Sequence, residues 1–197
     1  MASSIATDIF EKDKVSSKIS ADEAPKIFQK YGIFYQPDAA LARIAKNLGA
    51  SIGDREGFDQ LKNAIFHDQR LKSILEPYSN YLLPTCFPLG ADRTYYYAFR
   101  TTSQTPDPDP EDFVLLYVWH GKTEINLAVG SQTGLFHGVR AANGLYLVPY
   151  PQIQGYYDEV HVAMEEGGVL ILHPRSAANV TEGFARGLKL IRPPEPG

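Results

Sequence analysis

Cysteine, tryptophan and methionine are scarce in this chain of 197 residues, which contains one, one and two of them. The single cysteine, Cys86, has no partner for an internal disulfide, so the fold must be held by its apolar core. The N-terminal stretch MASSIATDIFEKDK contains no apolar run of signal-peptide length. We therefore expect a cytoplasmic protein that does not contact membranes.

A strongly basic surface is also missing. The 19 Lys and Arg residues are outnumbered by 23 Asp and Glu residues, which gives a formal net charge of -4. Because these charges are interspersed, the sequence lacks the cationic stripe that would hold a nucleic-acid backbone. The length and the 44% hydrophobic content suit one domain. We expect that domain to span residues 20–197, after a polar and weakly patterned mobile arm at residues 1–19.

Helix signals are concentrated in the first half of the chain. Ser20 and Glu23 have the spacing of a capping box, and Gly32 can end the helix in the left-handed conformation. A short strand is predicted over Ile33 to Gln36, and similar start and end signals predict a helix over Asp38 to Gly49. A third helical region is predicted over Asp54 to Leu75, either continuous or restarting at Arg70.

Strand signals dominate the second half. From Phe113 to Pro193, short runs of Val, Ile, Leu, Tyr and Phe alternate with Gly, Pro, Asn and charged turn residues. An alternating strand is predicted over Arg93 to Thr101, and a solvated Pro/Asp-rich loop over Ser103 to Asp112. Helices followed by strands favour an α+β, mainly β fold: a jelly roll with helices packed outside and a pocket between its two sheets.

Three segments resemble a known family: Phe28 to Gln36, Ala141 to Gln152 with its NG-L-x-V-P pattern, and Gly167 to Ile191 with its GG-V-L-I-L-H-P-R pattern. They resemble the phytanoyl-CoA dioxygenase branch of the iron and 2-oxoglutarate oxygenases, in the divergent form found in fungal secondary metabolism. The resemblance implies a double-stranded β-helix, which is a cupin-like jelly roll.

The resemblance also implies a metal site that this sequence does not complete. The family binds iron through two histidines and one carboxylate. Ala178 stands where the distal histidine is expected, and Lys122 stands where the carboxylate should follow His120 by two positions. We therefore expect no metal and no cofactor. Iron(II) and 2-oxoglutarate, with Glu124 as a substitute ligand, form the alternative.

Acid-base residues are present without a metal site. The candidate catalytic residues are His120, Glu124 and His173, because the pKa of imidazole suits proton transfer near neutral pH and because strand alternation puts His120 and Glu124 on one face. The resemblance implies that Arg186 stands where an arginine grips the far carboxylate of 2-oxoglutarate. The candidate substrate-binding residues are Tyr97, Arg100, Asn126, Tyr146, His161, Arg175 and Arg186. Each is also compatible with a packing or surface role.

Three functions remain open. The favoured one is a metal-independent cyclase or isomerase that acts on a small hydrophobic natural-product intermediate by positioning and acid-base catalysis. The second is an iron and 2-oxoglutarate dependent oxygenase with a rearranged ligand set. The third is a non-catalytic small-molecule-binding or partner protein. A homodimer is expected, because an open barrel leaves edge strands available for pairing.

Overall fold

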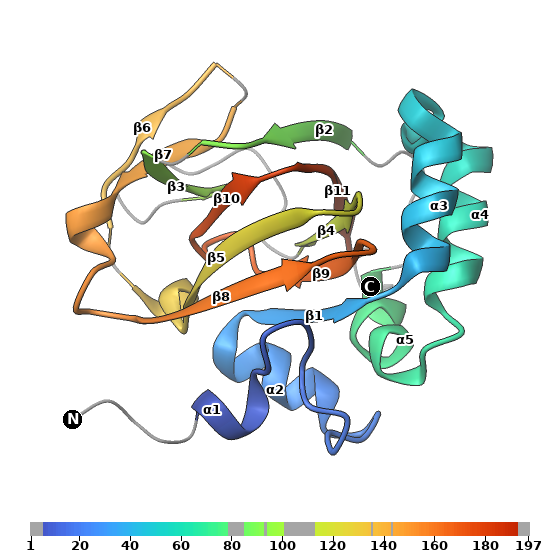
Figure 1. Cartoon of the computed structure of the whole chain (residues 1–197), viewed down its shortest axis with the longest axis horizontal. Helices are drawn as coiled ribbons and strands as arrows, with labels where there is room; N and C mark the ends of the chain where they lie inside the picture. Colours follow the sequence, from blue (N-terminus) through green and yellow to red (C-terminus); the bar gives the residue numbers. More distant parts are fainter. Residues whose placement is uncertain are drawn as a thin grey trace, which may run out of the picture.

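Two antiparallel sheets packed face to face form the body of the protein (Figure 1). The computed structural model describes residues 6–78, 85–92, 94–100, 113–134, 136–142 and 144–192. The five-stranded sheet contains, in spatial order, β1 (Ile33–Pro37), β9 (Gly168–Leu172), β4 (Phe113–Trp119), β11 (Phe184–Ile191) and β2 (Thr85–Gly90). The six-stranded sheet contains β6 (Val139–Arg140), β7 (Tyr146–Pro149), β3 (Tyr95–Ala98), β10 (Ala178–Glu182), β5 (Thr123–Val129) and β8 (Asp158–Met164).

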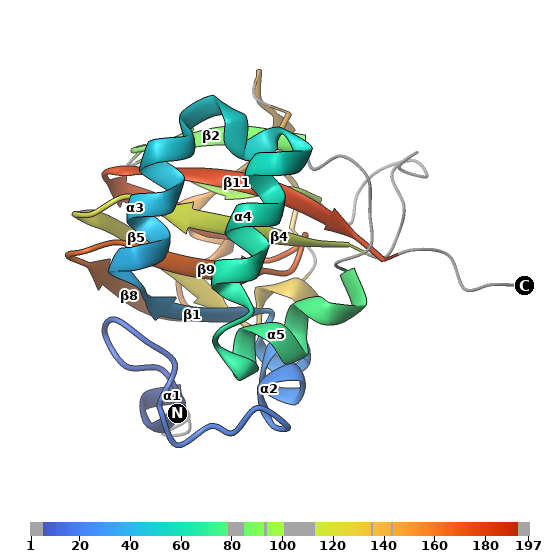
Figure 2. The same cartoon turned by 90° about the vertical axis from the view of Figure 1, so that its right-hand side faces the viewer.

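Helices cover the five-stranded sheet from outside. Figure 2 shows α3 and α4 lying across that sheet, with α5 and α2 near its β1 edge. The α-helices are α1 (Ala6–Ile9), α2 (Ala24–Tyr31), α3 (Ala39–Leu48), α4 (Arg55–Ile65) and α5 (Gln69–Leu75). The short 3-10 helices are Gly49–Gly53, Glu76–Tyr78, Ser131–Thr133 and Tyr150–Gln152. None of the helices within the described ranges is both long enough and apolar enough to cross a lipid bilayer.

Strand β4 is buried on both of its faces. Phe113 meets Phe99, which directly follows β3 of the opposite sheet, with ring centroids 5.2 Å apart, so Phe113 and the alternate residues up to Trp119 point between the sheets. Val118 points to the other face of the sheet, where it is aligned with Val169 of β9 and Gln36 of β1. The Gln36 side-chain oxygen accepts a hydrogen bond from Arg70 of α5, so this face is covered by helices. The continuous apolar sequence of β4 is therefore explained by a second sheet on one side and helices on the other.

Strand β5 shows the alternation of a sheet that faces water on one side. Ile125 and Leu127 belong to the main core, whereas the side chain of Glu124 is 41% exposed. Because alternate residues point to opposite faces, Glu124 and Asn126 lie on the outer face of the six-stranded sheet.

The predicted fold class and the main elements are confirmed. Gly32 ends α2 with φ of 73°, and the Asp38 carboxylate caps α3 by accepting from two amides. In the predicted capping box, Glu23 accepts from the Ser20 amide at 2.9 Å, but the Ser20 hydroxyl also donates to Glu23 and caps no amide. Strand β3 is shorter than predicted, and the predicted loop over residues 103–112 lies outside the described residues.

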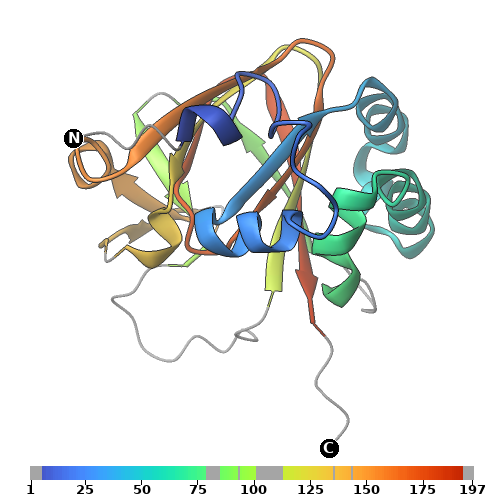
Figure 3. The same cartoon turned by 90° about the horizontal axis from the view of Figure 1, so that it is seen from below.

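The expectation of a mobile arm over residues 1–19 needs correction for residues 8–19. Phe10 and Val15 are buried in the main core, because the Phe10 ring packs against Tyr31 and Tyr35. The Val15 amide donates to the Tyr35 carbonyl of β1 at 2.8 Å, and the Lys12 carbonyl accepts from Ala163 of β8 at 3.1 Å. Seen from below in Figure 3, this segment spans from β1 to β8 and so links one edge of each sheet.

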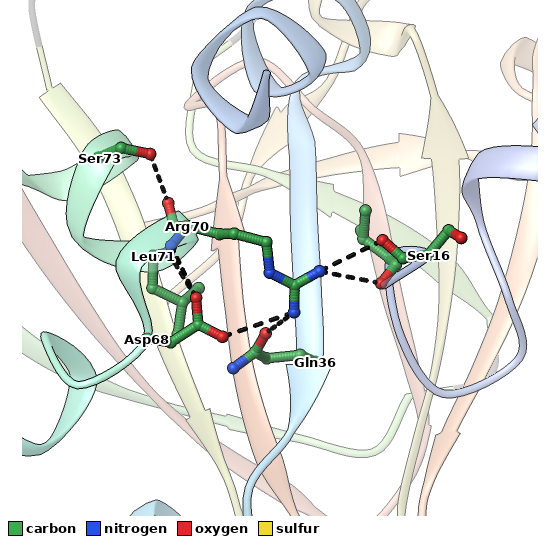
Figure 4. A network of polar contacts seen from close by, with 7 residues as sticks. Ser16, Gln36, Asp68, Arg70, Leu71 and Ser73 are labelled. Atoms are coloured by element: carbon green, nitrogen blue, oxygen red, sulfur yellow. Dashed lines mark hydrogen bonds and ion pairs between the residues drawn. The ribbon is translucent and has the colours of Figure 1, made fainter. Parts of the chain in front are cut away.

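Arg70 anchors this segment to the helices (Figure 4). Its guanidinium donates to the Gln36 side-chain oxygen at 2.6 Å and to the Ser16 carbonyl at 3.2 Å. Burial alone would raise the pKa of Asp68, but hydrogen bonds from Gln36 and from the Arg70 and Leu71 amides, with the Arg70 charge, lower it. That stabilisation is present above the ordinary Asp pKa of about 4 and is lost as pH falls through the lowered folded pKa.

Arg70→Met should therefore destabilise the fold by about 2 kcal/mol, since hydrogen bonds that involve a charged group contribute roughly 1.5 to 3 kcal/mol. For a domain of this size, the melting temperature should fall by about 4 to 8 °C in a thermal unfolding experiment. Arg55→Met is the control, because Arg55 is exposed at the start of α4. Equal melting temperatures for the two variants would contradict the anchoring role of Arg70.

Candidate functional site

Several described side chains that point between the two sheets are fully buried. Trp119, Leu115, Leu127 and Leu170 have exposed fractions of 0 or 1%, and Tyr117 is buried beside them. These side chains pack as a core. Two hollows lined by described residues lie instead on outer surfaces of the structure.

The outer face of the six-stranded sheet carries a groove of about 360 Å³. Its floor is formed by adjacent strands, since Asn126 of β5 pairs with Asn179 of β10 and with His161 of β8. The lining residues are Thr94, Tyr95, Tyr96, Glu124, Asn126, Tyr150, His161, Asn179 and Thr181. Three of the predicted site residues, Glu124, Asn126 and His161, are thus brought together.

His161 is held between the other two predicted residues. Its Nδ1 lies 2.8 Å from Asn126 Oδ1, and its Nε2 lies 3.7 Å from Glu124 Oε2. Because the Asn126 amide oxygen can only accept a hydrogen bond, the donor in this contact is the Nδ1–H of His161. In the neutral ring, the lone pair is then on Nε2. The side chains of His161 and Glu124 are 48% and 41% exposed, so both can reach a ligand.

Aromatic residues form one wall of the groove. Tyr96 and Tyr150 stack with ring centroids 6.1 Å apart, and both hydroxyls donate to Glu159, at 2.5 Å and 3.4 Å. Burial, followed by the hydrogen bond to Glu159, raises the pKa of Tyr96, while the charge of Glu159 raises the pKa of Tyr150. Both phenols therefore stay protonated at neutral pH.

His120 does not meet Glu124, although strand alternation suggested that they share a face. Strand β4 ends at Trp119, and the chain crosses to the other sheet through a turn in which Lys122 has φ of 61°. The turn breaks the alternation. His120 instead lines a separate hollow beside α3.

Arg186 does not point between the sheets either. It pairs with Val118, on the helix-facing side of β4, and its guanidinium lies 5.4 Å from the Phe184 ring. The residue that does point between the sheets is Lys189, which is 7% exposed and was not predicted as a site residue. Its Nζ lies 4.5 Å from the centroid of Phe113.

The other predicted residues are dispersed. His173 follows the end of β9, and its Nδ1 accepts from the Arg175 amide at 3.2 Å. Tyr97 donates to Asp92, and burial together with this bond raises the Tyr97 pKa to about 12. Tyr146 is buried on the outer face of β7, beside Ala98. Arg100 lies over Phe113, 4.7 Å from its centroid.

No protein-family model matches the chain, and no curated protein matches its sequence. Solved structures do match. The non-heme alpha ketoglutarate dependent carbocyclase SnoK from nogalamycin biosynthesis has a TM-score of 0.56 at 10% identity, over 90% of this chain and 86% of that one. The chain has the double-stranded β-helix fold of this enzyme.

Two further structures share this fold. EctD from S. alaskensis, solved with 2-oxoglutarate and 5-hydroxyectoine, has a TM-score of 0.54 at 15% identity, over 94% of this chain and 81% of that one. The non-heme alpha ketoglutarate dependent epimerase SnoN from nogalamycin biosynthesis has a TM-score of 0.51 at 11% identity, over 87% and 82%. Identities this low establish the fold and leave the activity of this chain to be argued from its own residues.

The described residues do not fit the iron centre that this fold implies. Ala178, which the family resemblance aligns with the distal ligand, pairs with Tyr97 and Leu127, and none of the three is a usual ligand of iron(II). The cations of Arg100 and Lys189 lie over the Phe113 ring, which points between the sheets, and positive charge there disfavours a metal ion. Within the described ranges, no group of three His, Cys, Asp or Glu residues could hold a metal.

Six of the nine residues that line the groove were not among the predicted site residues, and two of the six, Tyr96 and Tyr150, form its aromatic wall. Tyr96 lies one residue from Tyr97 and reaches the groove because β3 pairs with β10 at Ala178 and Tyr97. Tyr150 starts a 3-10 turn directly after β7. Only the cross-strand register, which a single sequence does not contain, places both rings beside His161.

Iron(II) or zinc(II) added to the protein should raise its melting temperature by no more than about 1 °C. A metal bound only by the native state at 100 times its dissociation constant would add about 2.7 kcal/mol. For a chain of this length, that corresponds to about 5 to 10 °C. A thermal shift of that size, reversed by a chelator, would contradict the prediction.

Proposed function

We propose that this protein is a metal-independent jelly-roll enzyme of natural-product metabolism, which catalyses an isomerisation or ring closure by proton transfer. The observation that carries the proposal is the position of His161, between Asn126 at Nδ1 and Glu124 at Nε2, in a groove of about 360 Å³. His161 takes the role of general base that sequence analysis gave to His120. Glu124 keeps its predicted place in the site.

The geometry supports one sequence of proton movements. His161 Nε2 removes a proton from a carbon next to a substrate carbonyl, and the bonding electron pair moves into the resulting enolate. The imidazolium that forms lies 3.7 Å from the Glu124 carboxylate, which stabilises its charge, while Asn126 fixes the ring through Nδ1. The same proton returns to another carbon, or the enolate carbon closes a ring onto a second carbonyl, whose oxygen takes up the proton.

The groove indicates the class of substrate. Tyr150, which is exposed and stacks on the buried Tyr96, offers an aromatic surface, while Asn126 and Thr94 add polar groups. A volume of about 360 Å³ lies within the range of small-molecule sites. We infer a small, mainly apolar ring compound that carries carbonyl or hydroxyl groups. The proposal requires no metal and no organic cofactor.

Structural neighbours support the reaction class without establishing it. SnoK is described as a carbocyclase and SnoN as an epimerase, both from nogalamycin biosynthesis. Ring closure and epimerisation are thus catalysed on this fold. Both are described as alpha ketoglutarate dependent, and the described residues of this chain offer no comparable metal ligands. We therefore propose the same class of reaction, catalysed by proton transfer in place of a metal and alpha ketoglutarate.

Proton transfer can be tested without knowing the natural substrate. Cyclic 1,3-diketones and hydroxylated aromatic ketones would be incubated with the protein in D₂O, under argon and with a chelator, and deuterium incorporation followed by NMR. The wild type should accelerate exchange. His161→Gln should lower the rate by roughly 10²- to 10⁴-fold, the usual contribution of a general base.

Controls separate catalysis from folding and from simple binding. His137→Gln, at an exposed histidine outside the groove, should exchange at the wild-type rate. Asn126→Ala should slow exchange, and Asn126→Asp, which keeps an acceptor for Nδ1–H, should restore part of the rate. If the panel binds and no compound shows exchange above buffer, the chain is a binding protein. Equal rates in His161→Gln and wild type would exclude His161 as the base.

A further inference from the structure

A second hollow, separate from the groove, lies between α3 and the turn that joins β4 to β5. Its volume is about 300 Å³. Its lining residues come from α3, from that turn and from the turn between β8 and β9: Ala39, Ala42, Arg43, Lys46, His120, Gly121 and Glu166. It shares no lining residue with the groove that contains His161.

The backbone around His120 is fixed from several directions. The His120 amide donates to the Phe184 carbonyl at 3.2 Å, and its carbonyl accepts from the Thr123 hydroxyl at 2.8 Å. At Gly121, a Cβ atom would lie 2.9 Å from the Glu165 carbonyl oxygen, so the two turns are in close contact. The wall of the hollow that carries His120 is therefore preorganised.

One edge of the His120 ring remains available to a ligand. The ring packs edge-on against Phe184, with centroids 5.3 Å apart, and its Nε2 is buried without a hydrogen-bond partner among the described residues. Nδ1 also makes no hydrogen bond to a described residue, but unlike Nε2 it is not buried. Nδ1 is therefore the nitrogen that keeps access to solvent and can donate.

Positive charge surrounds this ring. Arg43 and Lys46 are exposed on α3, and neither forms an ion pair with a described residue. The guanidinium of Arg186 also lies near Phe184, 5.4 Å from its ring centroid. Burial, Arg186 and Lys46 together lower the pKa of His120, which favours the neutral ring at neutral pH. The charged groups that face this turn are Arg43, Lys46, Lys122, Glu165, Glu166 and Arg186.

We propose that this hollow binds a small oxyanion, a phosphate or carboxylate group, through the charges of Arg43 and Lys46 and a hydrogen bond from His120 Nδ1–H. Two cations beside a neutral donor match an anion better than a neutral or cationic ligand. Glu166 at the rim opposes the anion and limits its affinity. The proposal is independent of the function proposed for the groove, because it involves none of the groove residues.

Imidazole NMR of the full chain gives a direct test. Sodium phosphate and sodium acetate would be titrated separately at constant ionic strength while the His120 resonances are followed. Contacts of this kind give dissociation constants in the millimolar range, so we expect a saturable shift below about 50 mM. Because a bound anion favours the imidazolium, the pKa of His120 should rise on saturation, and binding should tighten as pH falls.

Variants assign the shift to the hollow. Lys46→Met should weaken binding about tenfold, and Arg43→Met with Lys46→Met should abolish the saturable shift. Glu166→Gln should tighten binding, and Arg140→Met, at an exposed arginine on β6, should match the wild type. Each variant would first be shown to be folded by its amide spectrum.

Each outcome decides the proposal. Saturation by phosphate alone identifies a phosphate-bearing ligand, saturation by acetate alone a carboxylate-bearing one, and saturation by both a general oxyanion site. No saturable shift with either anion would overturn the proposal. An unchanged affinity in the Arg43 and Lys46 double variant would overturn it as well. Neither result depends on the activity of His161.

Discussion

The side chains of β4 include no charged group, and all seven residues of this strand are buried. Such a strand is stable only when both of its faces are removed from water. The six-stranded sheet covers one face through Phe99 and its neighbours, and the helix layer that contains α3 covers the other. The segment around Phe10 and Val15 then links β1 to β8 at the side where the two sheets would otherwise separate.

The burial of β4 decides where polar chemistry can occur. Large side chains such as Trp119 and Tyr117 pack between the sheets, while Glu124, Asn126 and His161 lie on the outer face of the six-stranded sheet. On β5, whose inner face supplies Ile125 and Leu127 to the core, the alternate residues Glu124 and Asn126 face solvent. The groove with His161 is therefore a consequence of how the core is packed.

Much of the fold could be predicted from local signals. Gly32, Asp38 and the apolar run of β4 each act within a few residues of chain, and each has the predicted role. The N-terminal segment could not be predicted, because Phe10 and Val15 are isolated apolar residues whose burial depends on Tyr35, which is distant in sequence.

The site was predictable only in part, for the same physical reason. Asn126 and His161 were selected separately, and only the pairing of β5 with β8 shows that they touch. His120 was assigned to the face of Glu124 on the assumption of a continuous strand, which fails at Lys122. Arg186 was carried over from a family resemblance, while the register of β11 puts Lys189 on the inner face.

The turn between β4 and β5 explains how two residues only four positions apart, His120 and Glu124, line two separate hollows. Thr123 is fully buried, and its hydroxyl lies within 3.2 Å of both the His120 and Phe184 carbonyls. It fixes the point where the chain leaves one sheet and enters the other. Before this point, His120 faces α3, and after it, Glu124 faces the groove. Because Thr123 between them is buried and hydrogen-bonded to two carbonyls, the side chains of His120 and Glu124 are held on opposite sides of this turn.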